Sequence, residues 1–388
     1  MFFGMLISAI GSSMVWPFLM IFIRQKVNIP LAQAASLMTI NAAAGIIAAM
    51  VSGLISDRFG RKWVMVISLA GNGLVYFFMA NAQSYLHFAI LMTFSGAFNP
   101  IYRVGADAML ADLIPAEKRA DAYALFRLSN NAGIAIGPIL GGFLASISYS
   151  ITFICAGCGM IIYSLLLAFF AVETLPRHMR LPSGTGKIFG GYLQVFRDTQ
   201  FLYFVGAFIL AQMCAVMIWI LMPVYANNVY NVPESQYGFI PTTNALMVVF
   251  FQVYVTSLTR RYKPIPIMML GTLFYTLAVG SVAFGHSFLG FWFVIVIMTI
   301  GELILMPTAS AFVAALAPPD MRGRYMSISG LTWSVAAGIG PIIGGYLNDK
   351  IAPVAAWYGG FLIGICGILA FYILLRHQSK TLPAVMIE

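Results

Sequence analysis

The stretch Gly137-Pro-Ile-Leu-Gly-Gly142 recurs almost unchanged as Gly340-Pro-Ile-Ile-Gly-Gly345, 203 residues further along the chain. The same offset relates several other clusters: Trp16 and Trp219, Asn28-Ile-Pro30 and Asn231-Val-Pro233, Pro115 and Pro318, Arg119 and Arg322. A single offset that holds in several separate stretches is hard to obtain from composition alone. The sequence therefore predicts that the two halves of the chain are repeats of one fold.

Composition places both repeats in a membrane. Of 388 residues, 61% are hydrophobic and 9% are charged, whereas soluble domains carry about 25% charged residues. A membrane-spanning helix needs about 20 residues, so the chain has room for roughly twelve. Apolar stretches predict spans at 3–23, 34–56, 63–81, 86–111, 120–145, 150–172, 201–225, 237–258, 265–284, 288–316, 325–347 and 354–375.

The longest polar interruption divides these spans into two equal sets. It runs from residue 173 to residue 200 and contains two prolines and a Ser-Gly-Thr-Gly cluster. We predict an all-α membrane protein with twelve transmembrane helices: a bundle of six over 1–172, a cytosolic linker over 173–200 and a second bundle of six over 201–388. Because the number of spans per half is even, the two repeats run parallel.

Basic residues set the predicted orientation. If the N-terminus is cytoplasmic, sixteen of the 21 Lys and Arg residues fall on the inner side of the membrane, as the positive-inside rule requires. We therefore expect both termini in the cytoplasm. The net charge of +9 is too thinly spread for a nucleic-acid partner.

The loop after the second span reads Gly53-Leu-Ile-Ser-Asp57-Arg58-Phe-Gly60-Arg61-Lys62. It combines a carboxylate at a helix end, a tight turn and three cations at the predicted cytosolic interface. An ordinary basic loop with a capping aspartate would look similar.

This loop resembles the complete signature G-x-x-x-D-R-x-G-R-K of the major facilitator superfamily. The resemblance implies the fold of that superfamily and a cytosolic gate formed by Asp57, Arg58 and Arg61, with Asp112 as the acidic partner of the arginines. The equivalent loop of the second half, residues 260–264, has lost the aspartate, so the latch is expected to be one-sided.

A face of small residues marks the fifth predicted span. Gly133, Gly137 and Gly141 recur every four residues, which permits close approach of another helix, and Pro138 removes a helical hydrogen bond. Static packing would explain the pattern. It also resembles the antiporter motif of exporters in the same superfamily, which implies a bending helix and export. On that basis we expect Gly137→Leu to block turnover more than it lowers the yield of folded protein.

Ionisable residues inside the spans are few, and each is costly to bury. Glu302 lies near the middle of the tenth span with no basic residue within a turn, so it is the predicted proton carrier; a permanently protonated carboxyl is the alternative. Arg103 and Asp107 lie four residues apart on the fourth span and can pair, as a static ion pair or as part of a proton relay. Antiporters of the superfamily usually carry an arginine earlier in this span, at about the position where this sequence has Met92.

By analogy with the superfamily, the first, second, fourth and fifth spans of each half line a central cavity. Its candidate binding residues are Trp16, Asn41, Asn99, Arg127, Trp219, Asn244 and Gln252. Most polar residues inside a helical bundle only form hydrogen bonds between helices, so each of these has that simpler explanation.

Taken together, the residues and the resemblance predict a proton-coupled exporter (an antiporter) in a bacterial cytoplasmic membrane. The 23 Met and 31 Phe residues suit small lipophilic substrates, including cations and drugs. Efflux of sugars or metabolites, lipid flipping, or a non-transporting receptor on the same fold remain alternatives. We expect no enzyme activity, no cofactor and no metal, and a monomer whose partners are the lipid bilayer, protons and a small-molecule substrate.

Overall fold

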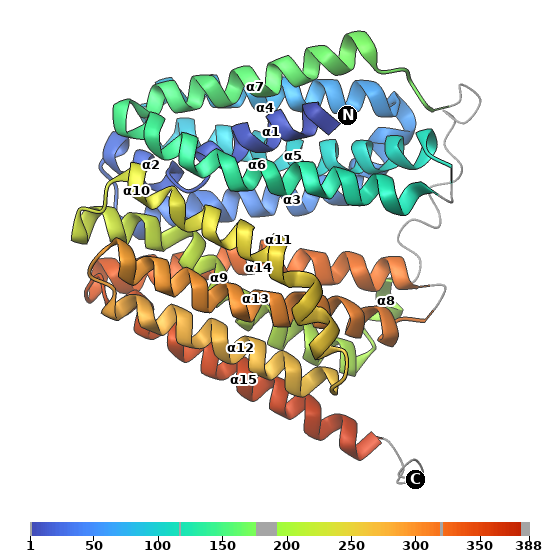
Figure 1. The fold of residues 1–388 in the computed structure, drawn as a ribbon, viewed down its shortest axis with the longest axis vertical. Coiled ribbons are helices and arrows are strands. Elements are labelled where there is room, and N and C mark those ends of the chain that lie inside the picture. Colours follow the sequence, from blue (N-terminus) through green and yellow to red (C-terminus); the bar gives the residue numbers. More distant parts are fainter. Residues whose placement is uncertain (1, 116–117, 176–191, 319–320, 382–388) are drawn as a thin grey trace. The chain divides into compact units, whose positions relative to one another are not determined.

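The computed structural model describes residues 2–115, 118–175, 192–318 and 321–381, so most of the predicted linker lies outside the described residues. All regular structure in these ranges is helical (Figure 1). The helices are α1 (Phe2–Val15), α2 (Leu19–Val27), α3 (Leu31–Phe59), α4 (Arg61–Asn81), α5 (Tyr85–Leu113), α6 (Arg119–Ile147), α7 (Tyr149–Phe170), α8 (Tyr192–Val195), α9 (Thr199–Tyr230), α10 (Glu234–Tyr237), α11 (Phe239–Thr259), α12 (Pro264–Ser281), the 3-10 turn η4 (Val282–Phe284), α13 (Phe288–Leu316), α14 (Arg322–Lys350) and α15 (Ala355–Thr381).

These helices match the predicted spans in order. Within the described ranges, 10 helical segments are long and apolar enough to cross a membrane, and the bent pair α1–α2 would make an eleventh. The remaining predicted span is α5, whose 29 residues are long enough but include Arg103, Asp107 and Asp112. The all-α membrane fold is therefore confirmed, and the predicted number of spans is approximately right.

The first predicted span is not the continuous helix that its apolar run suggested. It is broken between α1 and α2, whose axes differ by 44°. The break falls at Pro17, which has no backbone N–H to donate and whose ring crowds the carbonyl one turn earlier. At the repeat offset, the second half has Ile220 instead of proline, and α9 runs through this position without a break.

Backbone geometry supports the repeat. Asn28 and Asn231, which are 203 residues apart, are the two described non-glycine residues with positive φ, and both have φ 53°. Each ends a helix by donating its N–H to the carbonyl four residues earlier, at 2.9 Å for Asn28 and 3.0 Å for Asn231. Asparagine tolerates this left-handed conformation better than most residues. The two repeats therefore form the same turn with the same residue type.

By internal contacts the chain forms two compact units. Unit 1 comprises residues 1–185 and 223–245, and unit 2 comprises 186–222 and 246–388. The segment 223–245, which contains the end of α9, α10 and the start of α11, thus packs with the first half of the sequence. In unit 1, α1 lies against α6 and α7, α3 against α5, and α4 against α5 and α7. In unit 2, α12 lies against α13 and α15.

Candidate functional site

The predicted signature loop links three segments of unit 1. Gly60 separates α3 from α4 with φ 90°, and Arg61 begins α4. The guanidinium of Arg61 forms an ion pair with Asp112 near the end of α5 and donates to the carbonyl of Ala108 at 3.3 Å. The structure therefore brings Arg61 and Asp112 together. Asp57 and Arg58 are exposed at the end of α3.

Glu173, which the sequence analysis assigned only to the linker, also belongs to this loop. Its Oε1 accepts hydrogen bonds from the backbone N–H groups of Arg61 and Leu175, both at 3.0 Å. A carboxylate at a helix N-terminus is favoured by the helix dipole. A Cβ on Gly60 would lie 2.8 Å from the Glu173 Cδ, so glycine is needed here both for its positive φ and for the approach of this carboxylate.

We expect Gly60→Ala to destabilise the protein, because alanine rarely adopts φ 90° and its methyl group would displace Glu173. Strain of this kind costs about 1–3 kcal/mol. Gly53→Ala in the same signature is the matched control, because a Cβ there meets nothing within 4 Å, and alanine is preferred to glycine inside a helix by about 1 kcal/mol. Thermal midpoints measured in one detergent should fall for Gly60→Ala and stay level or rise for Gly53→Ala. Equal midpoints for the two variants would contradict this account.

The glycine face of α6 lies directly on α1. Added Cβ atoms on Gly133 and Gly137 would lie 2.9 Å from the backbone N of Ile10 and 2.7 Å from its backbone O, respectively. One on Gly141 would lie 2.7 Å from the Met14 Cα. The Ser13 hydroxyl also donates to the Gly133 carbonyl at 2.9 Å. The two helices are therefore packed backbone to backbone along this face.

The middle of α6 also packs on segment 223–245. A Cβ on Gly238 would lie 3.0 Å from the Pro138 carbonyl carbon, and the Thr242 hydroxyl donates to the Ala135 carbonyl at 2.6 Å. Nearby, the Glu234 carboxylate accepts from the Tyr149 hydroxyl at 2.5 Å and from the Asn227 side chain at 3.2 Å. Single polar residues at helix ends give no distinctive pattern, so this cluster could not be predicted from the sequence.

Glu302 lies half-buried on α13 in unit 2. The neighbouring Gly301 packs on α12, where a Cβ would be 2.8 Å from the Tyr275 ring, and the charge of Glu302 acts on the buried phenol of Tyr275. At the repeat offset, Glu302 corresponds to Asn99 and Tyr275 to Asn72. The carboxylate thus occupies a position that the first half fills with an amide.

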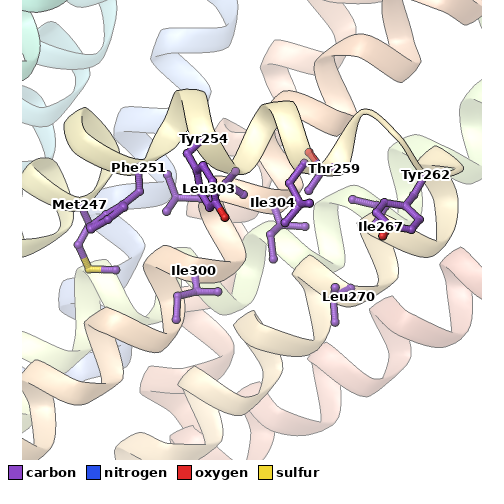
Figure 2. Close-up of a pocket in the computed structure, with 12 residues that line it drawn as sticks. Met247, Phe251, Tyr254, Thr259, Tyr262, Ile267, Leu270, Ile300, Leu303 and Ile304 are labelled. Atoms are coloured by element: carbon purple, nitrogen blue, oxygen red, sulfur yellow. The ribbon is translucent and has the colours of Figure 1, made fainter.

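An apolar pocket of about 620 Å³ lies beside the same helix. Figure 2 shows side chains from α11 facing those of α12 and α13 across it. Its lining residues are Met247, Phe251, Tyr254, Val255, Leu258, Thr259, Tyr262, Ile267, Leu270, Ile300, Leu303 and Ile304. Helical spacing places Ile300, Leu303 and Ile304 on one face of α13 and Glu302 on another, so the carboxylate does not line this pocket.

A second, polar cavity of about 80 Å³ lies within unit 1. Asn99, which was predicted as a binding residue, lines this cavity. The other lining residues were not predicted from the sequence: Met5, Ser8, Ala9, Ser12, Ser68, Leu69, Asn72, Phe98, Tyr102, Asn130 and Met160. The pairs Ser8–Ser12 and Ser68–Asn72, each four residues apart inside an apolar run, are the signal that could have found it.

The other predicted residues have varied surroundings. The Asn41 side chain donates to the Met92 carbonyl at 3.0 Å, and Gln252 donates to the Leu303 carbonyl at 3.1 Å. Both contacts join neighbouring helices. Trp16 is exposed at the α1–α2 break, whereas Trp219 is half-buried and Asn244 is buried.

The charged pair on α5 is only partly as predicted. The charge of Arg103 acts on half-buried Asp107. However, no carboxylate of the described residues lies within ion-pair distance of Arg103 or Arg127, and both arginines are exposed.

A family model described as the Major Facilitator Superfamily matches residues 1–301 and, a second time, residues 209–385. The chain belongs to the Major Facilitator Superfamily. It is thus a membrane-embedded transporter of small molecules.

Relatives in the superfamily include two named transporters. The chain is 26% identical to a "Na(+), Li(+), K(+)/H(+) antiporter" of Planococcus maritimus over 92% of its length and 89% of that protein. It is 27% identical to the "Multidrug resistance protein MdtH" of Escherichia coli, over 82% of its length and 78% of that protein.

Solved superfamily structures share the fold. A peptide transporter in complex with sulfate superposes with a TM-score of 0.81 at 15% identity, covering 98% of this chain and 93% of the other. A bacterial homologue of the human lysosomal transporter Spinster, in an inward-facing and occupied conformation, gives 0.77 at 14% identity over 97% and 95% of the two chains.

Proposed function

We propose that this transporter is a proton-coupled exporter of small lipophilic compounds in a bacterial cytoplasmic membrane, with both termini in the cytoplasm. The observation that carries the proposal is that one helix, α13, contributes both a wall of the apolar pocket and the intramembrane carboxylate Glu302.

The pocket fits a drug-sized lipophilic substrate. Its volume of about 620 Å³ lies inside the range of about 300–1,000 Å³ typical of small-molecule sites. Every lining side chain is apolar or aromatic except Thr259, so binding there would depend on burial of apolar surface.

Coupling would act through the movement of α13. An ionised carboxylate within the membrane costs several kcal/mol, and the cost changes when Glu302 takes up a proton beside Tyr275. The α12–α13 contact at Gly271 and Gly301 is too close to deform smoothly, and packed interfaces tend to have discrete arrangements. Protonation would therefore shift α13 between two packings and reshape the pocket that the same helix lines.

The relatives support the two parts of this proposal separately. One is named as a cation/proton antiporter and another as a multidrug resistance protein. The positive-inside distribution of Lys and Arg supports the orientation. The electrochemical proton gradient is a sufficient energy source, because one elementary charge crossing a membrane potential of 100 mV provides about 2.3 kcal/mol, roughly a fiftyfold accumulation.

A substrate panel in proteoliposomes with an imposed pH gradient tests the proposal. We expect lipophilic compounds to move in the direction opposite to the proton flow, and we expect sugars not to move. Na⁺, Li⁺ and K⁺ form a second arm, because alkali cations are the named substrates of one relative. If the gradient drives movement of alkali cations but of no lipophilic compound, alkali cations would replace lipophilic compounds as the substrate class. Transport at a rate that does not depend on the pH gradient would contradict the proposed proton coupling.

The signature loop supplies the proposed cytosolic gate. Arg61 is anchored by Asp112 and Glu173, which leaves exposed Asp57 as the carboxylate of the loop that is available for a latch. We expect Asp57→Asn to shift the population toward a cytosol-open state, seen as longer spin-label distances across the cytosolic face. Asp349→Asn, at the exposed end of α14, is the control. An unchanged distance distribution for Asp57→Asn would count against the latch.

A further inference from the structure

The apolar pocket of unit 2 lies at a place where the first repeat packs two helices together. In the first repeat α3 lies against α5, and a Cβ on Gly45 would lie 3.3 Å from the Gly96 carbonyl oxygen. The 203-residue offset makes Val248 of α11 and Thr299 of α13 their equivalents. Side chains at these two positions prevent the same close approach, and the described residues of α11 and α13 are not packed along their length as α3 and α5 are. The pocket lies in the space between them.

This pocket is long and has an exposed apolar wall. Figure 2 shows Met247 at one end and Tyr262 at the other. Between Met247 and Leu258 α11 rises by about 17 Å, at about 1.5 Å per residue, and one leaflet of the hydrocarbon core is about 15 Å thick. Phe251 and Tyr254, which line the pocket from α11, are 51% and 69% exposed. Apolar surface that stays exposed within a span favours contact with acyl chains, so the pocket has the depth and the lining for a lipid tail.

Three cations lie at the Tyr262 end of the pocket. Arg260, Arg261 and Lys263 flank the lining residues Thr259 and Tyr262 in the turn between α11 and α12. All three are exposed, and no carboxylate of the residues that the structure describes lies within ion-pair distance of them. In the proposed orientation this turn faces the cytoplasm, and basic residues at the cytoplasmic end of a membrane helix attract anionic lipid head groups.

We propose that the apolar pocket binds one anionic phospholipid of the cytosolic leaflet. An acyl chain lies along α11, and the phosphate lies on Arg260, Arg261 and Lys263. Arginine can hold a phosphate through two parallel hydrogen bonds, and lysine holds it as a point charge. Tyr262 lies at the level where head group and tail meet, a depth at which tyrosine is enriched in membrane proteins. The inference goes beyond the proposed export, because the lipid is a resident ligand that occupies the pocket when no substrate is there.

Binding of single lipids, followed by native mass spectrometry of the full chain in detergent, tests the proposal without substrate or pH gradient. The probes are anionic dioleoylphosphatidylglycerol and zwitterionic dioleoylphosphatidylcholine, which have the same tails. We expect the first anionic lipid to bind at least about tenfold more tightly than the first zwitterionic lipid, because only its net charge is complementary to the three cations. Equal affinities for the two lipids would overturn the proposal.

Substitution of the cations tests where the head group lies. Arg260→Gln, Arg261→Gln and Lys263→Gln should each weaken the anionic lipid about fivefold and leave the zwitterionic lipid unchanged. The matched control is Arg322→Gln, an exposed arginine at the start of α14 on the same predicted side of the membrane, which should change nothing. If Arg322→Gln weakens the anionic lipid as much as Arg260→Gln does, the lipid forms only a diffuse layer on a basic face and the site is wrong.

Filling the pocket tests where the tail lies. Leu270 lines the pocket from α12 and is 42% exposed, so Leu270→Trp should fold and should weaken the anionic lipid at least about tenfold, the equivalent of two methylene groups displaced from the pocket. Leu277→Trp, two turns further along α12 and 46% exposed but not a lining residue, should bind like the wild type. Unchanged affinity in Leu270→Trp would overturn the placement of the tail, and Leu270→Phe serves if the tryptophan variant does not fold. The Glu302→Gln protein should bind the lipid like the wild type, so a failure of proton coupling cannot be mistaken for a failure of this site.

Discussion

Glu302→Gln is expected to reduce pH-gradient-driven transport to background and to leave a folded protein that still binds an apolar ligand. Glutamine has nearly the same shape as protonated glutamate but cannot release a proton, so proton uptake and release could no longer drive α13 from one packing to the other. The apolar pocket lies on another face of α13 and should keep its affinity. The measurement is substrate uptake into inverted vesicles together with equilibrium binding of an uncharged apolar compound.

A second assay on the same variant distinguishes a proton carrier from a permanently protonated carboxyl. Exchange of labelled for unlabelled substrate, with no gradient, needs movement of the helices but no net proton transfer. It should therefore survive in Glu302→Gln while uphill transport is lost. Asp349→Asn, at the exposed end of α14, should retain both activities. Uphill transport by the Glu302→Gln protein at the wild-type rate would remove Glu302 from the mechanism.

Among the substitutions proposed for this protein, Gly137→Leu is expected to cause the largest loss of folded protein. A Cβ at this position would already lie 2.7 Å from the Ile10 carbonyl oxygen, and backbone cannot move aside as a flexible side chain can. Overpacking in a well-packed interior costs about 1–3 kcal/mol even where side chains adjust, so a leucine against backbone should cost at least that much. The close contact between α6 and α1 therefore changes the expectation from the sequence, which was a selective loss of turnover.

The repeat provides a matched control for this position. Gly340 is the equivalent of Gly137 and also precedes a proline, but its added Cβ would meet Met213 and Met217 of α9 at 3.5 Å, an ordinary contact. Gly340→Ala should therefore leave the thermal midpoint in detergent unchanged or raised, whereas Gly137→Ala should lower it. If both variants melt like the wild type, the α1–α6 contact is looser than the structure indicates. If Gly137→Ala melts normally but transports slowly, the glycine face acts in the movement of the helices instead.

The sequence by itself determined the helices, the superfamily and the repeat. Helix positions follow from apolar runs that the bilayer requires, because a backbone in hydrocarbon must satisfy its own hydrogen bonds. For that reason the predicted span 288–316 coincides with α13, and most other span ends agree within a few residues. The 203-residue offset anticipated the matching left-handed turns at Asn28 and Asn231, and the loop signature named the superfamily.

Tertiary structure decided what those helices place together. Glu173 caps α4, and Glu234 accepts a hydrogen bond from Tyr149. Neither contact could be predicted from sequence, because each joins residues 85 or more positions apart whose meeting depends on how the helices pack. The same holds for the polar cavity, whose serines and asparagines come from four helices. Hydropathy places a residue along the membrane normal, whereas the face it presents and the neighbour it meets are set by side-chain packing between helices.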